Sequence, residues 1–482
     1  MASEFRKGHF DRSSDRYPPL KGATVITRNP RNLSWTAPQT GHDWIDEDVL
    51  RAVVLLESYV DADAWRRRQA AVETRLFESW RRRREGESVP DLFDPKDRLA
   101  WLVFQARAYA TDRSRWSPEG GALIAPIMTR LGRSIPALMK IGGVEDRLAR
   151  LMTQNLSHPD GGFYELLVAL AYCRHGWKAD FIPEVRGGPK TPDLDVRQGR
   201  RRFRAECKRP KASQLAIAEK ARTEILATPM HALALNAGRS IVLESVLLVP
   251  ADTVPDDYFA QRAAAFLSDP SQDRWADGLS TGRVRDIDWH LARSVLDRDF
   301  VYFGASRMIE LLAGGYDHEA DHSLRAQWRP HPERPFWADA IYQASLMTVH
   351  HKSEASILGR SRDIGGFLKE ADDQLGDKTP GVLHVGVETW SGDTTDQVRH
   401  FRNVMKARLF EPRQSRLRFA YINYFTPVVT TGPDEAWAMH ETTAWNRIGS
   451  HAVLRPLEHH LAISDENGMS RGEHWDGRKN ET

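Results

Sequence analysis

The stretch from residue 161 to residue 209 reads GGFYELLVALAYCRHGWKADFIPEVRGGPKTPDLDVRQGRRRFRAECKR. Its first third has the apolar spacing of a helix, and this helix carries one acid, Glu165. The remainder predicts two short strands, one opening at Pro192-Asp193 and one ending at Glu206-Cys207-Lys208. Two carboxylates and a lysine on adjoining strands are what metal-assisted cleavage of a phosphodiester needs.

The two strands are expected to form a hairpin. Apolar residues alternate with polar ones along both, so each strand has one face toward the core and one toward water. A two-residue turn at Gln198-Gly199 would pair Asp193 with Arg204 and place Glu206 diagonally across from Asp193. Diagonal neighbours lie ~7 Å apart, a separation that one divalent ion can bridge. The register therefore predicts a site on one face, and an odd number of turn residues would destroy it.

The acid-x-lysine triplet has no weight by itself. The chain contains two such triplets, Asp94-Pro95-Lys96 and Glu206-Cys207-Lys208, which is the number expected by chance for this composition. The first triplet also follows a Pro-Asp pair, but Asp91 is too close in the sequence to Asp94 and Lys96 for the two motifs to lie on separate strands. In addition, Pro95 cannot donate to a β-ladder. Only the second triplet has the hairpin context, so the hypothesis depends on that context.

The residue types suit magnesium. Mg²⁺ prefers oxygen ligands and binds one or two carboxylates together with water and phosphate. A nearby lysine can position the attacking water or stabilise the charge of the transition state. Cys207 would offer only its backbone carbonyl, because its side chain faces the core.

A helix with an inward glutamate, a strand opening KTPDLDV and a strand ending ECKR resemble the PD-(D/E)xK nuclease superfamily. The resemblance covers residues 160–249. It implies the restriction-endonuclease-like fold, Asp193 and Glu206 as metal ligands, Lys208 as the catalytic lysine and Glu165 as the helix-borne acid. It also implies Mg²⁺, with Mn²⁺ as a substitute, and a nucleic-acid substrate, for which we expect DNA before RNA.

Arginine is well suited to bidentate contacts with phosphate. The second strand and its turn contain a basic cluster, from which we expect nucleic-acid contacts by Arg200, Arg202, Arg204 and Arg209. Asp195 lies on the same polar face and could be a secondary metal ligand. The simpler interpretation is that Asp195 is solvated or paired with arginine.

Composition limits the other classes of function. The net charge of +2 says little about partners, no apolar run approaches the ~18 residues of a membrane span, and MASEFRKGHF does not look like a signal peptide. Two cysteines make a disulfide framework improbable. We expect a cytoplasmic enzyme without a membrane partner, and a homodimer would allow both strands of a duplex to be cut.

The fold class expected is α/β: a restriction-endonuclease-like mixed sheet flanked by helices, with an N-terminal all-helical domain. Helix-period patterns before residue 156 and alternating strands and helices after residue 336 support this. The expected divisions are a flexible arm (1–40), the helical domain (41–156), the nuclease core (157–249), an insertion or subdomain (250–335), α/β segments completing the core (336–430) and a C-terminal segment with a disordered end (431–482).

Two alternatives differ in class. A catalytically silent nucleic-acid-binding protein would keep the nuclease fold, although every expected catalytic position holds a competent residue. A zinc peptidase would use His318-Glu319-Ala320-Asp321-His322, which fits the HExxH pattern of two histidines one helical turn apart with a glutamate base. The context disfavours the peptidase, because two glycines precede the motif and no apolar stripe would pack such a helix.

Overall fold

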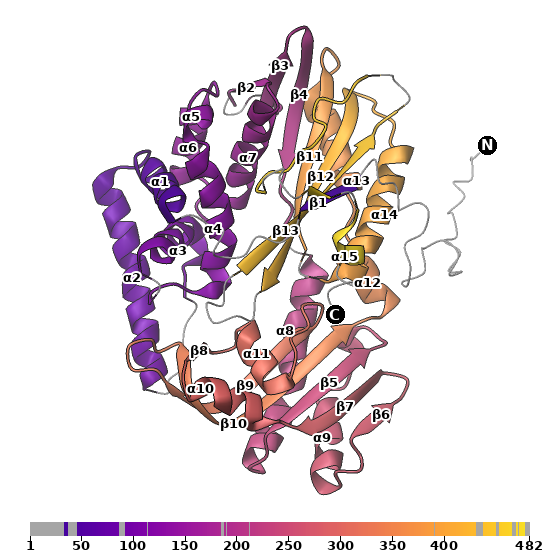
Figure 1. Ribbon diagram of the computed structural model, residues 1–482. Helices are drawn as coiled ribbons and strands as arrows, with labels where there is room; N and C mark the ends of the chain where they lie inside the picture. Colours follow the sequence, from indigo (N-terminus) through magenta and orange to yellow (C-terminus); the bar gives the residue numbers. More distant parts are fainter. Residues whose placement is uncertain are drawn as a thin grey trace, which may run out of the picture.

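The computed structural model is a mixed α/β structure with two mixed sheets flanked by helices (Figure 1). None of the described helices is long and apolar enough to cross a membrane. The residues described are 33–36, 46–85, 92–112, 114–184, 188, 190–211, 213–389, 391–429, 437–449, 453–464, 469–470 and 472–477.

The larger sheet has eight strands among the described residues. In spatial order they are β14 (Met469–Ser470), β1 (Leu33–Thr36), β13 (Trp437–Arg447), β12 (Arg416–Val429), β11 (Pro380–Glu388), β4 (Arg201–Lys208), β3 (Leu194–Gln198) and β2 (Lys178–Phe181). Strands β4, β11 and β12 run parallel, and their outer neighbours run antiparallel. The sheet therefore joins the predicted hairpin to segments about 200 residues later.

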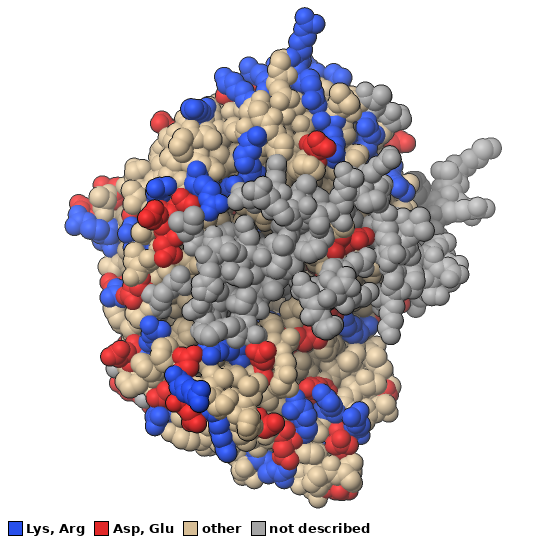
Figure 2. Space-filling view, in the orientation of Figure 1, with Lys and Arg blue, Asp and Glu red and all other residues tan. Residues whose placement is uncertain are grey.

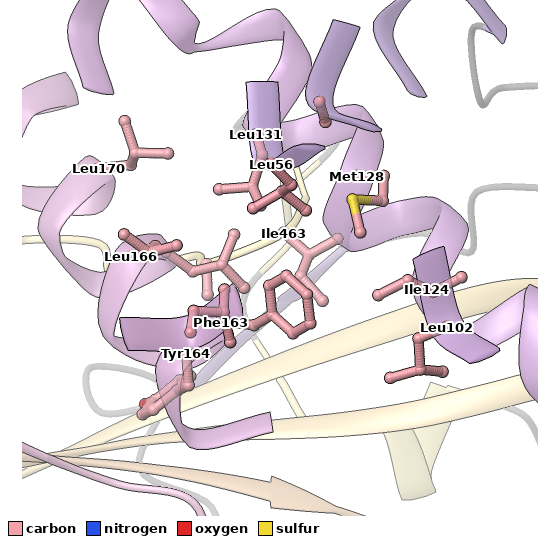
Figure 3. Close-up of a cluster of buried hydrophobic side chains, with 14 of the residues drawn as sticks. Leu56, Leu102, Ile124, Met128, Leu131, Phe163, Tyr164, Leu166, Leu170 and Ile463 are labelled. Carbon is pink, nitrogen blue, oxygen red and sulfur yellow. The ribbon is translucent and has the colours of Figure 1, made fainter. Parts of the chain in front are cut away.

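One face of this sheet packs against the N-terminal helices. These are α1 (Asp46–Glu57), α2 (Ala62–Arg84), α3 (Arg98–Thr111), α4 (Pro118–Arg133), α5 (Ile135–Leu138), α6 (Val144–Thr153) and α7 (Asp160–Arg174). Figure 3 shows Phe163 and Leu166 of α7 meeting Leu56, Ile124 and Met128 of the earlier helices. Helices and sheet share one continuous hydrophobic cluster, so the N-terminal helices have no core of their own.

The opposite face of the larger sheet is covered by α13 (Gly365–Leu375) and α14 (Asp393–Leu409). Leu368 and Leu375 of α13 pack on Leu383 and Val385 of β11. The four described residues of the expected flexible arm form β1, and the expected disordered end contains β14 and the short helix α15 (His474–Gly477). The remaining residues of the arm lie outside the described part of the chain.

The smaller sheet has the order β6 (Arg274–Ala276), β7 (Ser280–Asp286), β5 (Ile241–Leu247), β10 (Trp337–His351) and β8 (Val301–Tyr302), with β9 (Asp321–Pro330) also paired to β10. Strands β5 and β10 are parallel. Helices α8 (Gln214–Asn236) and α9 (Tyr258–Ser268) pack on one face, and α10 (Trp289–Leu296) and α11 (Ser306–Ala313) on the other.

The whole smaller sheet lies within the connection between β4 and β11, which are parallel neighbours in the larger sheet. The chain leaves β4 through α8 and returns from β10 through α12 (Glu354–Arg360) and α13. The expected limits of the insertion at residues 250 and 335 do not match this sheet, because β5 and β10 both belong to it.

The hairpin register corrects one prediction. Gln198 pairs with Arg201 and Leu194 with Ala205, so the turn residues are Gly199 and Arg200 and not Gln198 and Gly199. Gly199 has φ +57°, a left-handed conformation that glycine adopts readily and that two-residue hairpin turns need. The turn still holds two residues, so the same residues as predicted lie on the polar face of the hairpin.

Candidate active site

Three predicted residues, Asp193, Glu206 and Lys208, meet at the carboxyl end of β4, and the fourth, Glu165, is attached through Arg147. Asp193 immediately precedes β3 and donates its backbone N–H to Ala205 O at 3.1 Å. The residue after it, Leu194, is the first paired residue of β3 and stands opposite Ala205. Cys207 N donates to Asp193 Oδ2 at 2.8 Å, which fixes the carboxylate against the end of β4. The Asp193 carboxylate is therefore held beside the Glu206-Cys207 segment of β4.

Lys208 is held by side chains from two elements. Its Nζ lies 2.9 Å from Glu206 Oε1, 3.3 Å from Glu370 Oε2 and 3.0 Å from Gln374 Oε1. Burial acts to lower the pKa of this lysine, but the neighbouring carboxylates outweigh it and raise the pKa. Lys208 thus keeps its positive charge beside Glu206. Glu370 and Gln374, which lie on α13, were not predicted because they stand over 160 residues away in the sequence.

Arg147 of α6 is a further member of the site that sequence reasoning missed. Its Nη1 lies 3.0 Å from Glu165 Oε2, and its Nη2 lies 3.7 Å from Asp193 Oδ1. The same guanidinium reaches Glu184 at 2.8 Å and stacks over Phe181. Nothing in the surrounding sequence, VEDRLARLMT, distinguishes Arg147 from a solvated arginine on an amphipathic helix. It links Glu165 to the other two acids.

The three carboxyl groups all have raised pKa values. Burial, followed by the charge of Asp193, raises the pKa of Glu165 to about 8 and the pKa of Glu206 to about 7. Burial also raises the pKa of Asp193, against the opposing effect of the Cys207 N–H. Two nearby cations, Arg147 and Lys208, do not fully compensate three acids, so the cluster favours additional positive charge.

The residues fit a divalent cation. Glu206 Oε2 is buried and accepts no hydrogen bond, and Asp193 Oδ1 is too far from Arg147 for one. These two oxygens are hard ligands of the kind that Mg²⁺ prefers. Glu165 does not join them in a close three-acid group, because its carboxylate is bound to Arg147. The structure thus brings together Asp193, Glu206 and Lys208, with Glu165 attached through Arg147.

Asp195, two residues along the same strand, behaves differently. Its carboxylate accepts hydrogen bonds from Arg197 and, at 2.6 Å, from Arg202. Burial acts to raise its pKa, but these arginines outweigh it and lower the pKa. Asp195 is therefore an arginine-paired acid, as the simpler interpretation held, and its oxygens are already occupied.

The four predicted nucleic-acid contacts are dispersed. Arg209 is bound to Glu388 and lies over the Phe425 ring, so its side chain is mostly buried. Arg204 is partly buried, with Nε lacking a hydrogen bond. Arg202 and Arg200 lie toward the turn end of the hairpin, about 14 Å and about 20 Å along the strand from Glu206. They belong to a different surface from the site itself.

The peptidase motif does not form the helix that HExxH chemistry needs. Residues before Asp321 make a turn, and His322 lies in β9 with its ring stacked on Tyr316. His318 and Glu319 instead approach Asp393, with ligand atoms within 4.8 Å of one another. Both oxygens of Glu319 are already engaged, one by Asp393 N at 2.8 Å and the other by Lys352 at 2.5 Å. The arrangement required for the zinc peptidase is therefore missing at residues 318–322.

Comparisons of the chain with protein-family models, with curated proteins and with solved structures found no match.

Proposed function

We propose that this protein is a metal-dependent nuclease of the PD-(D/E)xK type, acting on DNA before RNA, with Mg²⁺ or Mn²⁺ as its ion. The observation that carries the proposal is the convergence of Asp193, Glu206 and Lys208 at the end of β4, with one buried oxygen of Glu206 left without a partner. This arrangement agrees with a restriction-endonuclease-like sheet.

Each residue of the site has a definite role in this proposal. Asp193 and Glu206 would hold the ion, which when bound lowers the pKa of water and compensates charge on the phosphate. A water oxygen bonds to phosphorus, the bond to the leaving oxygen breaks, and a proton is passed to that oxygen. Lys208, kept protonated by its carboxylate neighbours, stabilises the negative charge of the transition state. Glu165 and Arg147 position Asp193 from the helix side.

A basic surface at the turn end of the hairpin supports a polyanionic substrate. Neighbouring strands of the larger sheet all present basic residues at this end, and Figure 2 shows Lys and Arg side chains gathered there, at the top of the view. The residues are Lys178, Arg197, Arg200, Arg201, Arg202, Lys378, Arg416, Arg418, Arg447 and Arg455. Phosphate backbones bind such surfaces in a salt-dependent manner. Arg200 and Arg202 thus keep a role in binding substrate at a distance from the cleavage site.

Cleavage by the full chain tests the proposal. Purified protein is incubated with Mg²⁺ or Mn²⁺ and with plasmid, linear duplex, single-stranded DNA and RNA. Lys208→Met should reduce cleavage at least a thousandfold, by removing charge stabilisation of the transition state worth about 4 kcal/mol. Lys369→Met is the matched control, because Lys369 is exposed on the adjoining helix α13.

The results have distinct meanings. If Lys208→Met still cleaved nucleic acid, the residues at the end of β4 would not be the cleavage site. Tight binding of nucleic acid without any cleavage by the unmodified protein would instead support the silent nucleic-acid-binding alternative. Light scattering with and without duplex DNA tests the proposed homodimer.

A further inference from the structure

The smaller sheet contains a hollow of about 970 Å³. It lies over the carboxyl halves of the parallel strands β5 and β10 and is closed on one side by residues 313–317, which follow α11. In open α/β sheets, ligands bind in crevices at the carboxyl ends of the parallel strands. Its volume is at the upper end of the range for small-molecule sites.

The sheet face changes character as it enters the hollow. Beneath α10 and α11 it presents Val242, Leu324 and Leu346, which are buried in one hydrophobic cluster. Two residues further along each strand, toward the hollow and on the same face, the corresponding side chains are Glu244, His322 and Thr348. The switch from apolar to polar side chains coincides with the place where helices no longer cover the sheet.

One buried polar atom in the hollow lacks a protein partner. His350 Nδ1 is buried without a hydrogen bond. Burial lowers the pKa of His322 to about 4 and raises the pKa of Tyr316 to about 12, so both side chains are neutral at pH 7. Their rings stack on each other with centroids 5.1 Å apart. Buried polar groups nearly always have partners, so a polar ligand or ordered water is required here.

The chemistry of the walls indicates the ligand. Neutral imidazole and phenol groups, with the hydroxyls of Thr281 and Thr348, can both donate to and accept from the edge of a polar ring. Arg274 adds positive charge on the β6 side, where its side chain is 73% exposed, whereas Arg283 is already paired with Glu244 of the same hollow. We propose that the hollow binds a nucleotide, with the ring edge against the histidines and the phosphate toward Arg274.

This proposal goes beyond the nuclease site. Its residues belong to the sheet inserted between β4 and β11, and none of them contacts Asp193, Glu206 or Lys208 in the hydrogen bonds and ion pairs of the site. Binding in the hollow should therefore survive Lys208→Met, and the two proposals can fail separately.

Calorimetry on the full chain in EDTA, which prevents metal-dependent cleavage, tests the site. The probes are nucleoside monophosphates, the corresponding nucleosides, inorganic phosphate and a short single-stranded oligonucleotide. At least one monophosphate should bind with a Kd below about 1 mM, and its nucleoside and phosphate should each bind at least about tenfold more weakly. The oligonucleotide distinguishes a nucleotide within a strand from a free one. If the hollow binds a nucleotide within a strand, the oligonucleotide should bind more tightly than the monophosphate.

Two variants locate the binding. Thr281 is exposed on β7, so Thr281→Trp should fill the hollow, leave the melting temperature unchanged and abolish binding. Arg274→Ala should weaken nucleotide binding about tenfold, through loss of one charged hydrogen bond. Arg329→Ala is the matched control, since Arg329 is similarly exposed on β9 and pairs with Asp339 outside the hollow.

Three results would overturn the proposal. No binding of any nucleotide by the folded protein would mean that water alone fills the hollow. If inorganic phosphate bound as tightly as the monophosphates, the base ring would contribute nothing to binding and the ligand would not be a nucleotide. Affinity unchanged in Thr281→Trp would place the nucleotide elsewhere on the chain.

Discussion

Two groups of buried acids in this protein have opposite environments. At the end of β4, Glu165, Asp193 and Glu206 have raised pKa values, and one oxygen of Glu206 has no partner. At the junction of α8, α12 and β9, Glu219 is buried and Asp321 is partly buried, and both are paired with arginine. Glu219 accepts from Ser356 and from Arg360 at 2.5 Å.

The carboxylates of the second group are paired with cations, although Nδ1 of His351 in the same group has no hydrogen bond. Asp321 lies 3.2 Å from Arg360 Nη2 and 3.1 Å from His351 Nε2. Burial acts to raise the pKa of Asp321, but its hydrogen bond from His351 and the charge of Arg360 outweigh burial and lower the pKa. Burial of an acid therefore does not mark a functional site by itself. The distinguishing feature is a missing partner, which a cation could supply.

The largest effect is expected on breaking the second group. Arg360→Met removes the cation shared by Glu219 and Asp321 and should lower the free energy of unfolding by about 3–5 kcal/mol, because Glu219 stays buried and Asp321 partly buried. Chemical denaturation at pH 7 measures the change. Arg362→Met, at an exposed neighbouring position, should change stability by less than about 0.5 kcal/mol. Equal stability of the two variants would contradict the contrast between the groups.

A divalent ion should stabilise the group at the end of β4. At a Mg²⁺ concentration of 100 times Kd, binding to the folded state adds about 2.7 kcal/mol and should raise the melting temperature by several degrees. The shift should be lost in Asp193→Asn and Glu206→Gln, which remove ligand charge, and retained in Asp195→Asn, whose carboxylate is already paired. A shift of the same size in all four proteins would place the ion elsewhere.

The smallest effect concerns Glu206 without metal. Its folded-state pKa of about 7 lies above the ordinary value of 4.5, so stability is lost as pH rises from about 4.5 through about 7. Glu206→Gln removes the ionisable group and should stabilise the metal-free protein by about 2 kcal/mol at pH 6, and by almost nothing at pH 4. Denaturation curves in EDTA at the two pH values provide the measurement. Destabilisation by this variant at pH 6 would show that the Glu206 carboxylate is already compensated.

The sequence predicted the site to the extent that it is local. Alternation along the two strands placed Asp193, Glu206 and Lys208 on one face, and the even-numbered turn preserved this although its position was wrong by one residue. The error arose because glycine tolerates either turn position, and the choice of Gly199 at φ +57° depends on backbone energies that residue types do not reveal.

Long-range contacts were not predictable. Arg147, Glu370 and Gln374 approach the strands from distant helices, and a lone arginine or glutamate on such a helix resembles a solvated residue. The limits of the insertion were misjudged for a similar reason, because β5 and β10 have the apolar pattern of any buried strand. Arg209, predicted to bind nucleic acid, is neutralised by Glu388 from β11.

The insertion between β4 and β11 also determines when the site is completed during synthesis. Gln374, which holds Lys208, is added 166 residues after it, about 10–30 s later at ribosomal rates. Throughout that interval β4 has no β11 partner and presents an open edge, a hazard for aggregation. A nascent chain therefore carries the carboxylates and the lysine before the helix that holds Lys208 has been made, and the arrangement is completed only after most of the protein has been synthesised.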